Sequence, residues 1–437
     1  MDVGVLGSGA IVPLALASME AVPGIRVKAL WCREHSRQRG EALAREYGIS
    51  QVFTDLESLF REGGVDTVYI ALVNPVHYAY ARAALLAGKN VILEKPFCPS
   101  FAQAQDLAEL ARRQGLFLLE AMPLWHGALF RKVRELVPRL GPIRVVQCNY
   151  SQYSSRYDRY LQKEVLPAFD PAAFGGALYD LDVYNIAFAA GLFGRPEKVA
   201  YAPNRGWNGV DTSGVLFLQY PGFQAVLTAA KDSNSPSFLQ IQGEKGWLKV
   251  EGKPIHPHRM VWKFVQGPDR DQFSTGAGKK EESVQSWTPP ERKNRMVEEF
   301  GDYARIVNGK KKAEAEAYLQ MTLTASEVLE RAAHSFPGVC VNKFSVELSS
   351  QYSYAAKCRV KSTVDENPMI RCDGVGVTRQ GSPSRTPRGQ KNRPAVKVIA
   401  GLLFSICNVS EQVRMGTSAK KKQFQYNDVK LHCPHLS

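Results

Sequence analysis

The sequence predicts an α/β domain with a doubly wound parallel sheet at residues 1–122, followed by an α+β domain with a large, mostly antiparallel sheet at 123–338. The first domain is predicted because continuously apolar segments alternate with helical ones, as in parallel sheets buried on both faces. The second is predicted because strand segments follow one another with turn dipeptides, and no helices, between them. Residues 339–437 fit neither pattern, and we expect an unstructured tail there.

In the first domain, apolar segments predict strands at 3–6, 27–31, 68–72, 91–93 and 116–119, with helices between them. The helix at 100–114 has the clearest bounds. Ser100 and Gln103 have the spacing of a capping box, and Gly115 is the residue type that commonly ends a helix.

In the second domain, the predicted strands are 143–150, 215–220, 224–229, 238–242 and 247–250. Helices are predicted at 177–192 and 295–307, flanking this sheet, and at 313–334. The last helix carries a recurring apolar stripe, which indicates packing against the sheet or against the first domain.

A glycine-rich turn, GSGAIV at residues 7–12, follows the first strand. Its glycines permit a tight turn and let backbone N–H groups approach a pyrophosphate at a helix N-terminus. Because the turn lies between a strand and a helix, it predicts a dinucleotide-binding Rossmann domain. We expect Gly7, Gly9, Ala10 and Ile11 to contact the cofactor.

The end of the second strand bears on which cofactor is bound. NAD-binding sites of this class place a carboxylate there, whereas this chain has Cys32 and Arg33, with Arg37 close behind. Arginine binds a 2′-phosphate through two hydrogen bonds. We therefore predict that these three residues favour NADP(H), with NAD(H) as the alternative because Glu34 is adjacent. The two arginines could instead be solvated charges at a helix start.

The segment at 68–96 has the pattern of a strand, a crossover helix and a second strand. It delivers Glu94 and Lys95 to the carboxyl end of the second strand, where ligands of open α/β sheets bind. Pro96 restricts the backbone and biases Lys95 towards an extended conformation. We predict that Lys95 is functional, against the alternative of a structural lysine.

A second motif, FGGALYDLDVYNI at 174–186, places Asp180 and Tyr184 at i and i+4, on one face of a helix. A tyrosine hydroxyl titrates near pH 10, so it needs a cationic neighbour to exchange a proton near neutrality. Lys95, brought from the first domain, is the expected neighbour. The alternative for Tyr184 is an aromatic core residue.

The net charge of +14 belongs mostly to the tail. Residues 339–437 hold 16 Lys/Arg against 6 Asp/Glu, whereas residues 1–338 hold 40 against 36. Three readings of the tail stay open: disorder, a basic nucleic-acid-binding arm, or a segment translated from a wrong frame or a fusion. We favour the first and third, and expect no nucleic-acid partner.

Eight scattered cysteines without a CxxC pair indicate reduced thiols and a cytoplasmic location. No apolar segment reaches the roughly 20 residues of a membrane helix, and the N-terminus lacks a signal-peptide pattern. In residues 1–338 no Cys or His pair has ligand spacing, so we expect no metal.

The chain resembles the Gfo/Idh/MocA oxidoreductase family in four segments over residues 1–338: GSGAI near residue 9, NPVH at 74–77, GKNVILEKP at 88–96 and FGGALYDLDVYNI at 174–186. The glucose–fructose oxidoreductase and dihydrodiol dehydrogenase branch is most similar, because inositol dehydrogenases carry histidine where this chain has Tyr184. The resemblance implies that Lys95 tunes Tyr184 and that Asp180 holds the substrate hydroxyl. One departure is Asp182, where the family often has glycine.

Further contacts are predicted from the same segments and their surroundings. Asn74, His77 and Glu94 are expected beside the cofactor, although a lone histidine can equally be a core residue. Trp125 and Tyr153 are expected beside the substrate. Trp125 could instead close the seam between the domains, and Tyr153 could belong to an aromatic packing surface.

We therefore expect an NAD(P)-dependent oxidoreductase that acts on a secondary alcohol or ketone of a sugar, cyclitol or dihydrodiol. A homo-oligomer, dimer or tetramer, is expected through the antiparallel sheet, with no membrane partner. Two alternatives remain: a non-catalytic dinucleotide-binding redox regulator, and an NAD-dependent glycosidase of the same family. The Lys95, Asp180 and Tyr184 set argues against a regulator, because a sensor needs no proton shuttle.

Overall fold

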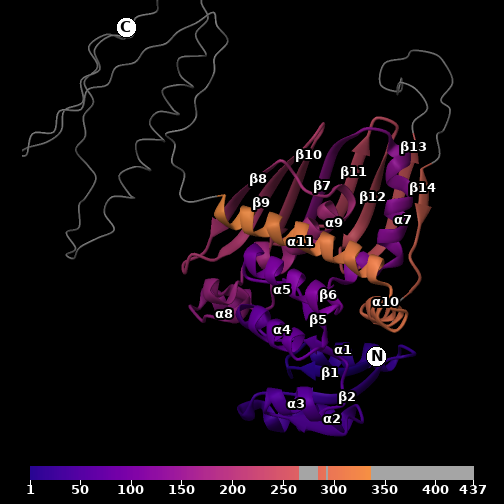
Figure 1. Ribbon diagram of the computed structural model, residues 1–437. Helices are drawn as coiled ribbons and strands as arrows, with labels where there is room; N and C mark the ends of the chain where they lie inside the picture. Colours follow the sequence, from indigo (N-terminus) through magenta and orange to yellow (C-terminus); the bar gives the residue numbers. More distant parts are fainter. Residues whose placement is uncertain (265–283, 292–293, 336–437) are drawn as a thin grey trace, which may run out of the picture. The chain divides into compact units, whose positions relative to one another are not determined.

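The computed structural model describes residues 1–264, 284–291 and 294–335 of the chain. The predicted tail at 339–437 lies outside these residues. Two sheets carry the described architecture, one six-stranded and parallel and one eight-stranded and mostly antiparallel (Figure 1). Both predicted sheets are confirmed.

The parallel sheet has the order β3-β2-β1-β4-β5-β6. Its strands are β1 (Asp2–Leu6), β2 (Arg26–Trp31), β3 (Gln51–Phe53), β4 (Thr67–Ile70), β5 (Asn90–Glu94) and β6 (Leu118–Ala121). The helices between them are α1 (Val12–Glu20), α2 (Arg37–Glu46), α3 (Leu56–Glu62), α4 (His77–Leu86) and α5 (Phe101–Gln114). From β1 the chain adds β2 and β3 on one side of the sheet, and from β4 it adds β5 and β6 on the other side. This change of direction opens a crevice at the carboxyl ends of β1 and β4.

Helix α5 begins and ends as its sequence predicts. The Ser100 hydroxyl accepts a hydrogen bond from the Gln103 backbone N–H at 3.3 Å, and Gly115 follows the helix with φ of 66°. Strand β3 was not predicted, because three residues give too short a pattern.

The larger sheet has the order β14-β13-β12-β11-β7-β10-β9-β8. Its strands are β7 (Ile143–Ser151), β8 (Lys198–Arg205), β9 (Asp211–Tyr220), β10 (Phe223–Ala230), β11 (Phe238–Gly243), β12 (Gly246–Lys253), β13 (His256–Phe264) and β14 (Gln285–Trp287). Strands β7 and β10 pair in parallel, and the other neighbours are antiparallel. Sequence reasoning missed β8, β13 and β14. Strands β8 and β13 contain prolines and lie at or near the sheet edges, and β14 has only three residues.

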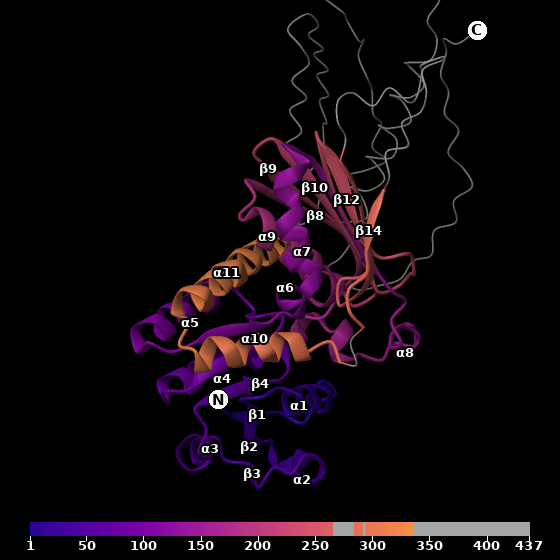
Figure 2. The same ribbon diagram turned by 90° about the vertical axis from the view of Figure 1, so that its right-hand side faces the viewer.

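One face of this sheet is covered by α7 (Ala128–Leu136) and α9 (Val183–Phe193), as Figure 2 shows from the side. Strand β9 alternates accordingly. Leu216 and Leu218 are buried in the core under these helices, whereas Val215 and Phe217 are 44% and 38% exposed on the other face.

The two last helices return to the parallel sheet. Helix α10 (Val297–Asn308) buries Phe300 and Tyr303 in the core formed by β1, β2 and β4, which corrects the prediction that it flanks the antiparallel sheet. Helix α11 (Lys312–His334) has buried residues in two further cores. Leu319 belongs to the core that α4 and α5 form with the parallel sheet, and Val328 belongs to the core of the larger sheet. Among the described residues, no helix is both long and apolar enough to cross a membrane.

Candidate active site

The glycine turn lies at the crevice between β1 and β4. Gly7 has φ of 126°, and a Cβ there would overlap the carbonyl oxygen of Ala71 just after β4. Gly9 and Ala10 are exposed, and no atom lies within 4 Å of a Cβ built on Gly9. Ile11 is the N-cap residue of α1. The turn is therefore pressed against the sheet on one side and open on the other, which fits a dinucleotide pyrophosphate at the helix N-terminus.

The three residues predicted to select the cofactor differ in availability. Cys32 is buried, with its Sγ against Gly40. Arg37 forms ion pairs with Glu41 at 3.0 Å and with Glu34 at 3.6 Å. Arg33 is exposed, and no carboxylate among the described residues pairs with it. Arg33 is therefore the one of these arginines that can bind a phosphate without first breaking an ion pair.

Asn74 connects the crevice to the second half of the chain. It follows β4, and its Nδ2 donates to the carbonyl oxygens of Ala173 and Phe174 at 3.3 and 3.2 Å. These carbonyls directly precede the Gly-Gly motif. Asn74 thus holds the segment that leads to Asp180 next to the carboxyl edge of the parallel sheet.

His77 and Glu94 hold the loop that carries Lys95. His77 is fully buried, with its ring nitrogens 3.0 Å from the Pro96 carbonyl oxygen and 3.1 Å from that of Leu72. Glu94 accepts hydrogen bonds from the Tyr69 hydroxyl at 2.6 Å and from the Lys95 backbone N–H at 3.2 Å. These contacts connect the carboxyl ends of β4 and β5 and the residues that follow them.

Lys95, Asp180 and Tyr184 meet, as the two motifs predict. The Lys95 Nζ donates to Asp180 Oδ1 at 3.1 Å and to the Asp180 backbone oxygen at 3.2 Å, and it lies 5.0 Å from the centroid of the Tyr184 ring. The Tyr184 hydroxyl has no hydrogen-bond partner among the described residues. An ammonium group and a free phenol therefore share one site.

The charges of this cluster are set by burial and by its ions. Burial raises the pKa of Asp180, but Lys95 and Lys231 lower it more, so the net pKa lies well below the usual range. Burial lowers the pKa of Lys95, but Tyr184 and Asp180 raise it above its usual value. Burial also raises the pKa of Tyr184, which Lys95 and Arg295 offset only in part. Tyr184 is thus a neutral phenol near pH 7, although Lys95 shifts its pKa downwards, as expected of a cationic neighbour.

The helix that carries Asp180 begins differently from the prediction. Leu178–Asp182 form a π-helical turn that leads into α9. A π-turn winds more widely than an α-turn, and such turns are frequent at functional sites. The Leu178 backbone N–H donates to Asp211 Oδ2 at 2.7 Å, and a Cβ at Gly176 would overlap the same carboxylate. The missing side chain of Gly176 therefore leaves room for the Asp211 carboxylate, which accepts the backbone N–H at the start of the turn.

Sequence reasoning missed Lys231. It directly follows β10 and its Nζ donates to Asp180 Oδ2 at 2.8 Å. Only the pairing of β10 beside β7 brings this lysine, 51 residues away in sequence, to the carboxylate. A strand followed by Lys-Asp-Ser carries no sequence signal for such a role.

Three other residues lie outside the cluster. Trp125 is buried in the core, where its indole Nε1 donates to the Ala187 carbonyl oxygen at 2.9 Å. The indole packs in the core of the second half of the chain, and its contact with a substrate stays a prediction. Tyr153 is 47% exposed, with its hydroxyl donating to Asp158 at 2.6 Å. Asp182 is fully buried and accepts from Asn185 at 2.7 Å.

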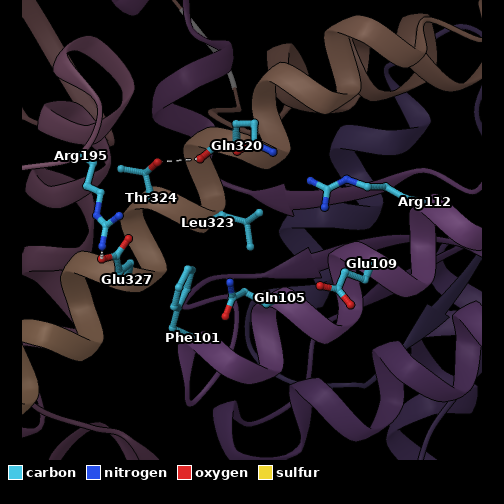
Figure 3. A pocket seen from close by; sticks show the side chains of 9 residues that line it. All are labelled: Phe101, Gln105, Glu109, Arg112, Arg195, Gln320, Leu323, Thr324 and Glu327. Atoms are coloured by element: carbon cyan, nitrogen blue, oxygen red, sulfur yellow. Dashed lines mark hydrogen bonds and ion pairs between the residues drawn. The ribbon is translucent and has the colours of Figure 1, made fainter.

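A hollow of about 360 Å³ lies elsewhere, between α5 and α11 (Figure 3). It is lined by Phe101, Gln105, Glu109, Arg112, Arg195, Gln320, Leu323, Thr324 and Glu327, none of them a predicted site residue. Its arginines are paired, Arg112 with Glu316 at 2.7 Å and Arg195 with Glu327 at 2.5 Å. Within the described part of the chain, no cluster of His, Cys, Asp and Glu could hold a metal ion.

Two family matches agree with this geometry. Residues 1–121 match the oxidoreductase family with an NAD-binding Rossmann fold, and residues 130–249 match the C-terminal domain of GFO/IDH/MocA proteins.

Several oxidoreductases are similar to this chain in sequence. A scyllo-inositol 2-dehydrogenase (NADP(+)) of Bacillus subtilis is 29% identical over 329 residues, which cover 75% of this chain and 94% of the relative. A trans-1,2-dihydrobenzene-1,2-diol dehydrogenase of Xenopus tropicalis is 26% identical over 290 residues, covering 63% and 84%. An uncharacterized oxidoreductase of Escherichia coli, YgjR, is 35% identical over 216 residues, covering 49% and 66%.

Solved structures share the fold. A 3-ketoreductase from Actinomadura kijaniata in complex with TDP-benzene and NADP has a TM-score of 0.62 at 22% identity, over 77% of this chain and 97% of that one. An oxidoreductase from Agrobacterium radiobacter in complex with NAD+, L-tartaric acid and magnesium has a TM-score of 0.62 at 14% identity, over 77% and 96%.

Proposed function

Since the chain belongs to the Gfo/Idh/MocA family of NAD(P)-dependent oxidoreductases, we propose that it transfers a hydride between NADP(H) and a secondary alcohol or ketone of a sugar, cyclitol or dihydrodiol. The observation that carries the proposal is the meeting of the Lys95 ammonium with Asp180 and with the Tyr184 ring. Lys95 comes from the carboxyl edge of the parallel sheet, whereas Asp180 and Tyr184 come from the helical segment that follows the Gly-Gly motif.

The open glycine turn would hold the pyrophosphate of the cofactor, Arg33 would bind a 2′-phosphate, and Lys95 would lie near the nicotinamide. When bound, the nicotinamide supplies or accepts the hydride. Every other step falls to side chains of the chain itself.

Tyr184 is the residue to which we assign proton transfer. As a neutral phenol it donates its proton to the carbonyl oxygen when a ketone is reduced. The phenolate left behind lies beside the Lys95 ammonium, which stabilises the negative charge in a buried site. Asp180, held ionised by its lysines, accepts a hydrogen bond from a substrate hydroxyl and fixes the carbinol carbon for hydride transfer. In the reverse reaction the phenolate takes the hydroxyl proton, so alcohol oxidation should quicken as pH rises.

The preference for NADP(H) rests on Arg33 and stays a proposal, as does the substrate. The relatives named above include a scyllo-inositol and a dihydrodiol dehydrogenase, so they support a polyol-like substrate without selecting a branch. The cytoplasmic location and the domain boundaries at residues 122 and 338 also stay predictions.

We also propose that a second copy of the chain covers the outer face of the eight-stranded sheet. The support is the exposure of Val215 and Phe217 on the face that carries no described helix. Sedimentation of the wild type and of Phe217→Lys tests this. A dimer or tetramer that dissociates in the variant supports it, and a monomeric wild type contradicts it.

The function is tested by titrating the protein with NADPH and NADH, followed by turnover measurements on a panel of inositols, sugars, dihydrodiols and their ketones. We expect tighter binding of NADPH and NADP(H)-linked turnover of at least one panel member. Tight binding without turnover of any member would favour the redox regulator. Release of an aglycone from added glycosides without net change in NAD(P)H would favour the glycosidase.

A further inference from the structure

Lys231 is buried behind the proposed active site. Its side chain is 2% exposed. The Nζ donates to the Ala168 carbonyl oxygen at 2.6 Å and to Asp180 Oδ2 at 2.8 Å, and it lies 4.5 Å from the centroid of the Phe169 ring. Because these groups surround the ammonium, Lys231 does not itself meet a substrate.

Asp180 is held by two lysines from two different sheets. Lys95 at the end of β5 takes Oδ1, and Lys231 after β10 takes Oδ2. A carboxylate with a single cationic partner can turn and offer that partner both oxygens. With one oxygen assigned to each lysine, the carboxylate is fixed in rotation. The side-chain exposure rises from 2% at Lys231 to 17% at Lys95 and 38% at Asp180, so Lys231 stands at the closed end.

The same lysine secures the segment below the Gly-Gly motif. The Ala168 carbonyl oxygen that it contacts also accepts the Gly176 backbone N–H at 3.1 Å. A Cβ at Gly175 would lie 2.5 Å from the Pro167 carbonyl oxygen, so the glycine pair packs directly on this segment. Lys231 thus joins the segment, the π-helical turn and Asp180 through one ammonium.

We propose that Lys231 is a positioning residue of the hydride-transfer site. By holding Asp180 Oδ2 it keeps the carboxylate from turning onto Lys95, and so leaves the Lys95 ammonium over the Tyr184 ring. Without Lys231, both oxygens of Asp180 become available to Lys95 and draw it away from the phenol. The kinetic consequences rest on the proposed function, whereas the structural consequence does not.

The test compares Lys231→Met with Lys249→Met. Lys249 is a matched control because it also belongs to the antiparallel sheet and lies over an aromatic ring, 5.6 Å from the centroid of Phe238. In Lys231→Met we expect kcat to fall about 10²-fold, as for a small misplacement of reacting groups, with NADPH affinity within twofold of wild type. The acid limb of the kcat/KM profile for alcohol oxidation should move to higher pH, because Lys95 leaves the Tyr184 ring and stabilises its phenolate less. Lys249→Met should change none of these.

A crystal structure of the variant gives a readout that needs no known substrate. We expect both Asp180 oxygens to face Lys95, whose Nζ should leave the roughly 6 Å range of a cation–π contact with Tyr184. Unchanged positions of Asp180 and Lys95, or wild-type kcat with an unmoved acid limb, would overturn the inference. A wild type that transfers no hydride would count against the proposed function instead. If Lys231→Met fails to fold, Lys231→Gln keeps a donor for the Ala168 carbonyl and serves in both measurements.

Discussion

Two aspartates two residues apart on the π-helical turn have pKa values that are shifted in opposite directions. Asp180 lies between lysines and is ionised, whereas Asp182 is fully buried without a cation. Its Oδ1 accepts from Asn185 at 2.7 Å, and its Oδ2 has no partner among the described residues. Burial raises the pKa of Asp182 from 3.8 to about 7. We predict that Asp182→Asn stabilises the protein at neutral pH.

The magnitude follows from the two pKa values. Above pH 3.8 the unfolded chain loses the Asp182 proton while the folded chain keeps it, so each pH unit lowers the free energy of unfolding by about 1.4 kcal/mol until the pKa of about 7 is passed. The penalty is therefore about 1.6 kcal/mol at pH 5 and about 4 kcal/mol at pH 8, as an upper bound. Asparagine removes the charge and keeps an oxygen for Asn185.

Urea unfolding of wild type and variant at pH 5 and pH 8 measures the difference. The gain in Asp182→Asn should be larger at pH 8 by about 2–3 kcal/mol. Asp158→Asn at the surface controls for the loss of one negative charge. An equal gain at both pH values, or a loss at pH 8, would refute the assigned protonation state.

Three further predictions concern the cofactor crevice. Gly7→Ala should lower the melting temperature and weaken NADPH binding, because φ of 126° and the nearby Ala71 carbonyl leave no room for a Cβ. Gly9→Ala should leave the melting temperature unchanged. Equal melting temperatures for both variants would count against the tight turn. Arg33→Ala should weaken NADPH binding by about tenfold without changing NADH binding, as measured by fluorescence titration. Arg37→Ala should weaken NADPH binding less, because Arg37 is already paired with Glu34 and Glu41. Equal effects on both cofactors would contradict the phosphate role of Arg33. His77→Leu should cost about 1–3 kcal/mol in urea unfolding, because a buried carbonyl oxygen loses the N–H that the neutral ring donates. A loss confined to NADPH affinity would show that His77 contacts the cofactor instead.

The proximity of Lys95 and Tyr184 was predictable because the sequence shows where the strands of the parallel sheet end. An apolar strand that runs into Glu-Lys-Pro must deliver the lysine to the carboxyl edge of the parallel sheet, and a Gly-Gly helix start presents Asp180 and Tyr184 together. The pKa of Tyr184 was not predictable, because it depends on how completely the surrounding core excludes water.

Residues whose partners come from strand pairing escaped prediction. Lys231 reaches Asp180 only because β10 lies beside β7, a parallel pair that successive hairpins would not suggest. The same limit applies to α10, whose amphipathic pattern does not say which of two sheets it covers. His77 was placed near the cofactor by its motif, but its ring spans two strand ends that no local pattern identifies.

The central claim is that an ammonium group from the parallel sheet serves a phenol from the second half of the chain. The most direct measurement is turnover and NADPH binding of Lys95→Met, with Lys89→Met as the control lysine that bonds the Val65 carbonyl oxygen away from the site. Loss of turnover by about 10³-fold or more in Lys95→Met, with NADPH binding still measurable and Lys89→Met unaffected, is the predicted result. Unchanged turnover in Lys95→Met would contradict the account.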